Sequence, residues 1–358
     1  MKAVRQLVIT LTIVLTGCAD QGRGSDPEPV DVTEDSLITA IADEAILPAV
    51  TGFSSSAQAL QSVAESFCNG VSAQGLGNLQ GEWRDVLERW YRLSLYNFGP
   101  LNNDIVFPPY TFVDGLRLRG TDYTETIRSE ISNDITGDQQ LTDDYFAAKT
   151  FQRVGLLALE SAIFETSTPE HSRATADILA EYEFQPRKCE VLLGLSRQIA
   201  TRARSFSDQW TVGSAESEEA FREVFVADRL EDGTESLTQV LLSAQEFLDY
   251  IQARRVALVA AQISMHSWQS IAATIDEVEL LLRGRAIGSQ SLFSAMEAAG
   301  GQNAISTVES SIEQVRMAIT QRDSEMLEIT LGFLDGNFKR EIPDTLDVVL
   351  GISFSDGD

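Results

Sequence analysis

A single carboxylate stands in an otherwise apolar stretch of the chain. Residues 154–164 read VGLLALESAIF, and Glu160 is the only charged side chain among them. On a helix, the side chains three and four positions away from Glu160 are all apolar: Leu156, Leu157, Ile163 and Phe164. A segment that is apolar on every side is typical of a buried helix. Since burying an unpaired carboxylate is costly, we expect Glu160 to be protonated, paired or solvated in a cavity.

Three roles for Glu160 remain open at this level. In the first, it belongs to a structural network, with Arg84, Arg89 or Arg153 as candidate partners. In the second, it faces a ligand or a metal ion in a cleft between two halves of the protein. In the third, it is the general base of a hydrolase, a role that requires a carboxylate placed next to an activated water.

Other residues with catalytic potential form no recognised motif. The chain has two histidines, His171 and His266, and no H-E-x-x-H zinc motif. We expect His171 in solvent at a helix start and His266 in the core or at its rim. G-x-S-x-G, P-loop, G-x-G-x-x-G and C-x-x-C-H are absent as well, so α/β-hydrolase, nucleotide and covalent haem chemistry have no support. Trp83 and Trp90 lie two helical turns apart and are expected in the core, with a ligand wall as the alternative.

The composition limits the partners of the protein. The 358 residues include 27 Lys and Arg against 54 Asp and Glu, which gives a net charge of −27. Nucleic acids and anionic lipid surfaces are bound by clustered cations, so this balance excludes nucleic acid and a polybasic membrane patch. An apolar content of 43% indicates a globular protein with a substantial core.

The N-terminus is typical of an exported lipoprotein. Residues 1–17 combine a short basic start with an apolar run that is too short to span a membrane, so they predict a signal peptide. The sequence LTGC ends at Cys18 and is similar to a bacterial lipobox, which predicts acylation of Cys18, for example with palmitate. Ala19 in place of Asp favours the outer membrane, facing the periplasm. The alternative is an ordinary cleaved signal with an incidental cysteine. Residues 18–34 are acidic and contain proline, as a tether does.

Two further cysteines remain after Cys18 is lipidated. Cys68 and Cys189 would lie in an oxidising compartment, which predicts a disulfide between them. Two buried free thiols are the alternative.

Almost all of the remaining chain has helical periodicity and predicts an all-α protein of two helical bundles, residues 35–212 and 213–358. Residues 36–68 predict a long helix with a kink at Pro48, and residues 100–120 an ordered loop. Single helices are expected over 142–165, around Glu160, and over 233–261. Gly155, together with Ala158 and Ala162, predicts that another helix approaches the Glu160 segment closely. The other expected helices are 77–97, 122–133, 170–184, 187–208, 216–228, 266–283, 289–298, 302–320 and 323–338.

Three segments carry a resemblance to a known family. GNLQGEWRDVLERWYRLSLYNFGPL (77–101), GLLALESAIF (155–164) and DVVLGISFSDGD (347–358) resemble the imelysin-like family, also named peptidase M75, in matching order. Within that family the chain is most similar to a branch of periplasmic lipoproteins. The resemblance implies an all-α fold of two halves of the four-helix-bundle type. It also implies the family motif G-x-H-x-x-E, which has been proposed to bind metal.

The motif is incomplete in this chain. Gly155 and Glu160 match it, but Leu157 occupies the position of the histidine. The resemblance therefore implies a binding role in metal handling, with iron as the metal, Glu160 as a remaining ligand, and other iron-uptake proteins of the envelope as partners. The open alternatives are a peptidase-like hydrolase that uses Glu160 and a scaffold lipoprotein without a small ligand. A carboxylate alone is a poor metal site, because zinc takes several N, S or O ligands and hard cations take several oxygens.

Overall fold

The computed structural model describes residues 33–104, 106–115, 122–214, 217–286 and 288–350. Within these ranges the regular structure is helical throughout and contains no β-strand, so the all-α prediction is confirmed. From Val32 onward the chain forms one compact unit. The signal peptide of residues 1–17, Cys18 and most of the 18–34 tether lie outside the described residues. The division of the protein between residues 212 and 213 stays a prediction.

The first long helix consists of three consecutive segments. α1 (Glu34–Ala40) begins at a capping box, in which the Thr33 hydroxyl accepts the N–H of Ser36 and the Ser36 side chain binds back to Thr33. A π-helical segment (Ile41–Ile46) follows, and α2 (Leu47–Asn69) continues the helix. The kink expected at Pro48 stays a prediction; the π-helical segment ends two residues before this proline.

The π-helical segment leaves a backbone group that another part of the chain satisfies. Pro48 has no N–H, so the carbonyl of Glu44 lacks its partner four residues later. Arg285 supplies the missing donors, since its Nε lies 3.2 Å and its Nη2 3.0 Å from that oxygen. A residue 241 positions later in the chain thus caps the interrupted turn.

By length and composition, the helix from Glu34 to Asn69 could cross a membrane, and it is the one such helix in the part of the chain that is described. Half of its most apolar window is buried inside the protein. Its buried side chains, among them Phe53, Leu60 and Phe67, pack against other helices. In this structure it is the central helix of the first group of helices.

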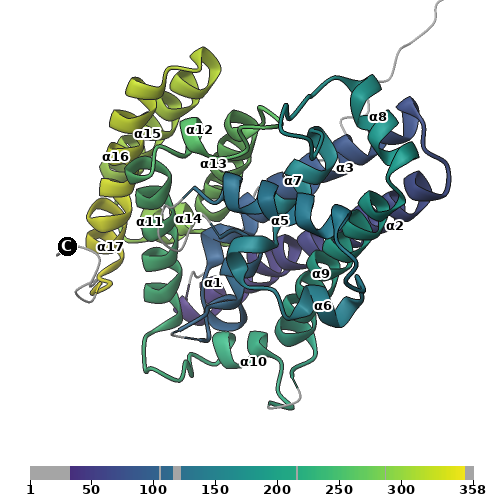
Figure 1. Ribbon diagram of the computed structural model, residues 1–358. Helices are drawn as coiled ribbons and strands as arrows, with labels where there is room; N and C mark the ends of the chain where they lie inside the picture. Colours follow the sequence, from purple (N-terminus) through teal and green to yellow (C-terminus); the bar gives the residue numbers. More distant parts are fainter. Residues whose placement is uncertain (1–32, 105, 116–121, 215–216, 287, 351–358) are drawn as a thin grey trace, which may run out of the picture. The chain divides into compact units, whose positions relative to one another are not determined.

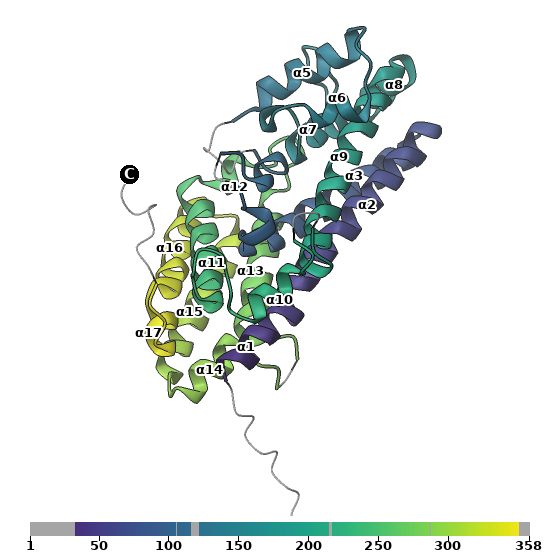
Figure 2. The ribbon, with the colours of Figure 1, turned by 90° about the horizontal axis from the view of Figure 1, so that it is seen from below.

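The first group is built around α2, α3 (Ala73–Leu93) and α9 (Pro186–Thr211), which run side by side (Figure 2). α2 contacts both of the others along its length. Cys68 at the end of α2 and Cys189 at the start of α9 are joined by a disulfide, with their Cα atoms 5.7 Å apart. The shorter helices of this group are α5 (Thr124–Thr136), α6 (Asp143–Ala147), α7 (Leu156–Phe164) and α8 (Thr175–Phe184), with 3₁₀ turns at Ser94–Tyr96, Gly99–Leu101, Pro109–Phe112 and Phe151–Arg153.

The second group contains the helices of the C-terminal part, which Figure 1 shows in green to yellow. α16 (Ser324–Lys339) lies between α11 (Ser236–Ala253) and α15 (Gln302–Gln321), and α13 (Ser267–Arg283) packs on α15. α13 also packs on α3, which joins the two groups. α12 (Val256–Val259), α14 (Leu292–Ala298) and α17 (Glu341–Leu346) complete this group, whereas α10 (Phe221–Val226) contacts α1 and α9 of the first group.

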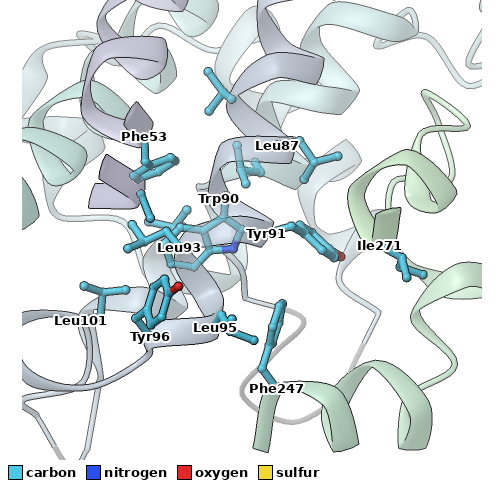
Figure 3. Packing of buried hydrophobic residues seen from close by; sticks show 14 of the residues in the cluster. Phe53, Leu87, Trp90, Tyr91, Leu93, Leu95, Tyr96, Leu101, Phe247 and Ile271 are labelled. Atoms are coloured by element: carbon cyan, nitrogen blue, oxygen red, sulfur yellow. The ribbon is translucent and has the colours of Figure 1, made fainter. Parts of the chain in front are cut away.

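The buried side chains form one continuous core across both groups. Figure 3 shows the junction at the C-terminal end of α3, where Trp90 faces Phe53 and Tyr91 lies on the side of Phe247. The ring centroids are 5.2 Å apart in the first pair and 5.9 Å in the second. Because Phe53 belongs to α2 and Phe247 to α11, neighbouring residues of α3 connect the two groups of helices.

Two expected helices are interrupted, and both interruptions shape the candidate site. The helix expected over 142–165 is divided into α6, a 3₁₀ turn and α7. The helix expected over 233–261 ends at Ala253, because Arg255 has a left-handed φ of 51° that an α-helix cannot contain. The helix expected over 216–228 is reduced to α10. The single-helix prediction was wrong in these places.

Candidate functional site

Glu160 lies on α7, one of the most thoroughly buried helices of the protein. Of its nine residues, all except Leu157 are buried, and Glu160 itself is 1% exposed. α7 packs against α3, α5 and α9, which accounts for the burial of a helix this apolar. The expectation that the Glu160 segment is a buried helix agrees with this arrangement.

Gly155 fixes the point where α7 begins. Its φ of +87° is a conformation that side chains other than that of glycine rarely adopt, and a Cβ there would lie 2.6 Å from the carbonyl oxygen of Val113. The same oxygen accepts the N–H of Leu156 at 2.9 Å. Gly155 therefore precedes the helix and allows the close approach of a loop. For Gly155 the expectation that it allows the approach of another helix was wrong, whereas Ala158 and Ala162 are fully buried on α7, which packs against other helices.

The Glu160 carboxyl binds a backbone amide of a distant segment. Its Oε1 accepts the N–H of Ser264 at 2.7 Å, across 104 residues of sequence. None of the three candidate arginines binds it: Arg84 lies over the ring of Phe164, Arg89 lies 3.8 Å from Asp85, and Arg153 lies 3.1 Å from Glu130. The ion-pair version of the structural role was wrong, and a hydrogen bond takes its place.

Burial raises the pKa of the Glu160 carboxyl from 4.5 to about 7. The backbone N–H and the side chain of Ser264 lower this pKa and the negative charge of Glu165 raises it, but removal from water is the largest contribution. Glu160 therefore changes its charge in the neutral range, where ordinary glutamates are ionised.

The segment that reaches Glu160 has an unusual backbone. Ala261 and Met265 have φ values of 47° and 60°, in the left-handed region, on either side of Ser264. Such conformations cost about 1–3 kcal/mol each outside glycine. Two glutamates hold the segment in place: Glu160 accepts from Ser264, and Glu88 Oε1 lies 2.8 Å from His266 Nε2. Strain of this kind is concentrated at functional sites.

A cavity of about 50 Å³ lies between α3, α7, the start of α5 and residues 259–263. A water molecule needs roughly 10–15 Å³ measured in this way, so the cavity has room for a small chemical group. Leu157 and Glu160 both line it, which places the histidine position and the glutamate of the motif in one cavity. The aromatic lining residues are Trp83, Tyr91, Tyr123 and Phe151, and the acidic ones are Asp114, Asp122 and Glu160.

The described residues do not fit a metal ion at this position. No three side chains of His, Cys, Asp or Glu converge within the described ranges in a way that could hold one. Leu157 contributes no donor atom, and one oxygen of Glu160 is occupied by Ser264. Neither histidine makes a hydrogen bond to Glu160: His171 Nδ1 lies 3.3 Å from the carbonyl oxygen of Thr166, and His266 binds Glu88.

Sequence reasoning found some of the cavity residues and missed others. Glu160, Leu157 and Trp83 were candidates; Trp83 is 1% exposed, and its Nε1 donates to the carbonyl of Leu156 at 3.1 Å. Tyr123 and Ser264 were not identified. Tyr123 directly precedes α5, and Ser264 acts through its backbone N–H, a group that every residue except proline carries.

Comparisons with known proteins address the family and the fold. The family model of imelysin, peptidase M75, matches residues 46–342. No curated protein matched the chain. The crystal structure of an imelysin-like protein from Psychrobacter arcticum 273-4 has a TM-score of 0.64 at 16% identity, covering 90% of this chain and 99% of that one.

A second solved structure extends the comparison of the fold. It is the "putative iron-regulated protein A precursor" from Parabacteroides distasonis ATCC 8503, with a TM-score of 0.52 at 12% identity, covering 87% of this chain and 94% of that one. Identities this low speak for the fold alone. The family match spans most of the sequence and contains the Gly155–Glu160 motif. The chain belongs to the imelysin family.

Proposed function

We propose that this protein is a lipid-anchored, periplasm-facing protein of the bacterial outer membrane that serves iron handling by non-enzymatic binding of a ligand in the Glu160 cavity. One observation carries the binding role. A carboxyl that is 1% exposed lines a cavity, with Leu157 where the family motif has a histidine. A buried carboxyl retained beside open space is suited to meet a ligand.

Iron enters the proposal through the relatives. The imelysin family and a solved structure whose name refers to iron regulation support an iron-related role. The lipid anchor rests on Cys18 in LTGC and on the acidic tether that follows. Because the described residues offer no set of metal ligands, iron would be handled through a bound organic ligand or through partner proteins of the envelope.

Iron accumulation tests this function. Cells that lack the protein are supplied with the wild type or with Glu160→Gln, starved of iron, and given radioactive iron. We expect the deletion and the Glu160→Gln cells to accumulate less iron than the wild-type cells, at equal amounts of protein in the envelope. Equal accumulation in all three would overturn the proposal.

One observation favours a hydrolase as the second candidate. The pKa of Glu160, raised to about 7 by burial, suits a general base at neutral pH. However, the described cavity residues supply neither a metal site to activate water nor a histidine. The test is an assay of peptidase activity on unfolded protein substrates. Activity that copurifies with the wild type and disappears in Glu160→Gln would favour this candidate.

A further inference from the structure

The lining of the Glu160 cavity combines negative charge with aromatic rings. Three carboxylic acids and four aromatic side chains border it, whereas no lysine, arginine or histidine does so among the described residues. Aromatic ring faces and carboxylates both attract cations. The described lining therefore offers several groups that attract a cation.

The second oxygen of Glu160 is available to a ligand. Oε1 is occupied by the Ser264 N–H. The Ser264 side chain and the Ile263 N–H also act on the carboxyl, but no hydrogen bond of ordinary geometry from the described residues reaches Oε2. Oε2 is also not among the fully buried polar atoms that lack a hydrogen-bond partner, so part of its surface faces open space. A carboxylate held in this way can accept one further donor without giving up its bond to Ser264.

Three described lining residues of the cavity are exposed at the surface: Asp122, Val259 and Gln262. We place the entrance of the cavity at these residues. One oxygen of Asp122 accepts the N–H of Thr124 at 2.8 Å, which fixes its position before α5. An entering cation would pass this carboxylate before it reaches Glu160.

We propose that the cavity binds the ammonium group of a small alkylamine, with Glu160 Oε2 as the acceptor of its N–H groups and the aromatic rings as the walls around its methylene groups. This inference rests on the proposed binding function and names the chemical class of the ligand. An ammonium group has three N–H donors, whereas a calcium or magnesium ion takes about six or more oxygen ligands. The available oxygen of Glu160 can accept an N–H of an ammonium group, but alone it falls far short of the oxygen shell of a metal ion.

The size of the cavity agrees with this ligand. About 50 Å³ of space holds a few water-sized groups, such as an ammonium group with its first methylene groups. A longer alkyl chain would extend past Val259 towards the surface. Near neutral pH the ligand also favours the ionised form of Glu160, because an ion pair in a cavity with little water is strong.

Calorimetry of the soluble chain, residues 19–358, tests the proposal, since this chain contains the whole compact unit from Val32 onward. The probe is n-butylammonium at pH 8, and n-butanol is the neutral control of the same length. We expect binding of the amine at one site per chain and at least tenfold weaker binding of the alcohol. Glu160→Gln should weaken amine binding at least tenfold. Glu309→Gln, a surface carboxylate that pairs with Arg283, should leave it unchanged.

A second variant keeps the test valid if Glu160→Gln fails to fold. Tyr123→Leu replaces a half-buried ring at the cavity and should weaken amine binding several-fold while the helical circular dichroism is retained. Equal affinity for amine and alcohol, or amine binding that is indifferent to both variants, would overturn the proposal. Stoichiometric binding of calcium, ferrous or zinc ions that depends on Glu160 would also overturn it.

The two proposals fail in different ways. If n-butylammonium does not bind but Glu160→Gln still lowers iron accumulation in cells, the ligand class is wrong and the binding function remains. If the amine binds as expected but iron accumulation is unchanged, the iron role is wrong and the cavity remains an amine site.

Discussion

The buried carboxyl of Glu160 makes the stability of the protein depend on pH in a defined direction. Its pKa is raised by burial to about 7 in the folded protein, against 4.5 for an ordinary glutamate. Between these two values the folded state binds a proton that the unfolded state releases. The free energy of unfolding therefore decreases as the pH rises from about 4.5 to about 7, and the loss is complete above that range.

The size of this effect follows from the shift. A difference of about 2.5 pKa units corresponds to about 3 kcal/mol, at roughly 1.4 kcal/mol per unit. Glu160→Gln keeps an oxygen for the Ser264 N–H but removes the ionisation. Relative to wild type, we expect this variant to gain about 2–3 kcal/mol of stability between pH 5 and pH 8, because part of the loss has already occurred at pH 5.

Urea unfolding of both proteins at pH 5, 6, 7 and 8 measures this difference. The test is how the difference in stability between the two proteins changes with pH, since the substitution also has a pH-independent effect on packing and hydrogen bonding. Glu309→Gln serves as the control, because surface ion pairs contribute little, about 0–1 kcal/mol. A difference between wild type and Glu160→Gln that stays constant within about 0.5 kcal/mol would refute the reasoning, since the carboxyl would then not be desolvated in the folded protein.

Three further predictions concern contacts that stabilise the fold. Gly155→Ala should lower the free energy of unfolding by about 1–3 kcal/mol in urea titrations, because of the positive φ and the backbone oxygen 2.6 Å from the new Cβ. Replacing Cys68 and Cys189 by serine should lower the free energy of unfolding by about 5 kcal/mol in the same assay, because the disulfide closes a loop of 121 residues and so reduces the entropy of the unfolded chain. A loss below about 1 kcal/mol would contradict this reasoning. Arg285→Ala should cost about 1 kcal/mol, and this loss should shrink when Pro48 is also replaced by alanine, whose N–H can serve the free carbonyl.

Helices with strong periodicity and clear ends could be predicted from the sequence almost to the residue. The expected helices at 302–320 and 323–338 correspond to α15 (Gln302–Gln321) and α16 (Ser324–Lys339). Both carry an apolar stripe on one side, and Asp323 caps the second through the N–H groups of Glu325 and Met326. Local sequence was sufficient in these cases because local interactions define both the helix and its ends.

The places where helices are interrupted could not be predicted, because tertiary contacts impose these interruptions. The sequence around Arg255, QARRVALV, has neither glycine nor proline, yet the helix stops there and Arg255 takes a left-handed conformation. Conversely, Gly155 was interpreted as a small residue within a helix. Its role depends on the Val113 carbonyl 42 positions earlier, a contact that no local pattern indicates.

The candidate site was also predictable only in part. The odd position of Glu160 in an apolar helix was visible in the sequence, and so was its membership of a motif. Its partner was not, since the partner is a backbone amide in a segment 104 residues away. A charged residue in an apolar helix signals that a polar group meets it, but the identity of that group follows only from the fold.

The replacement of the motif histidine by Leu157 changes the chemistry of the cavity as a whole. Leu157 and Glu160 both line it, so a histidine at position 157 would place an imidazole and a carboxylate in the same small space, as a metal pair requires. With leucine the cavity becomes an apolar and aromatic enclosure around one buried carboxylate. Such an enclosure discriminates against strongly hydrated metal ions and favours a cation that carries its own apolar surface. The departure from the motif and the aromatic lining therefore both support the proposed ligand, an alkylammonium cation.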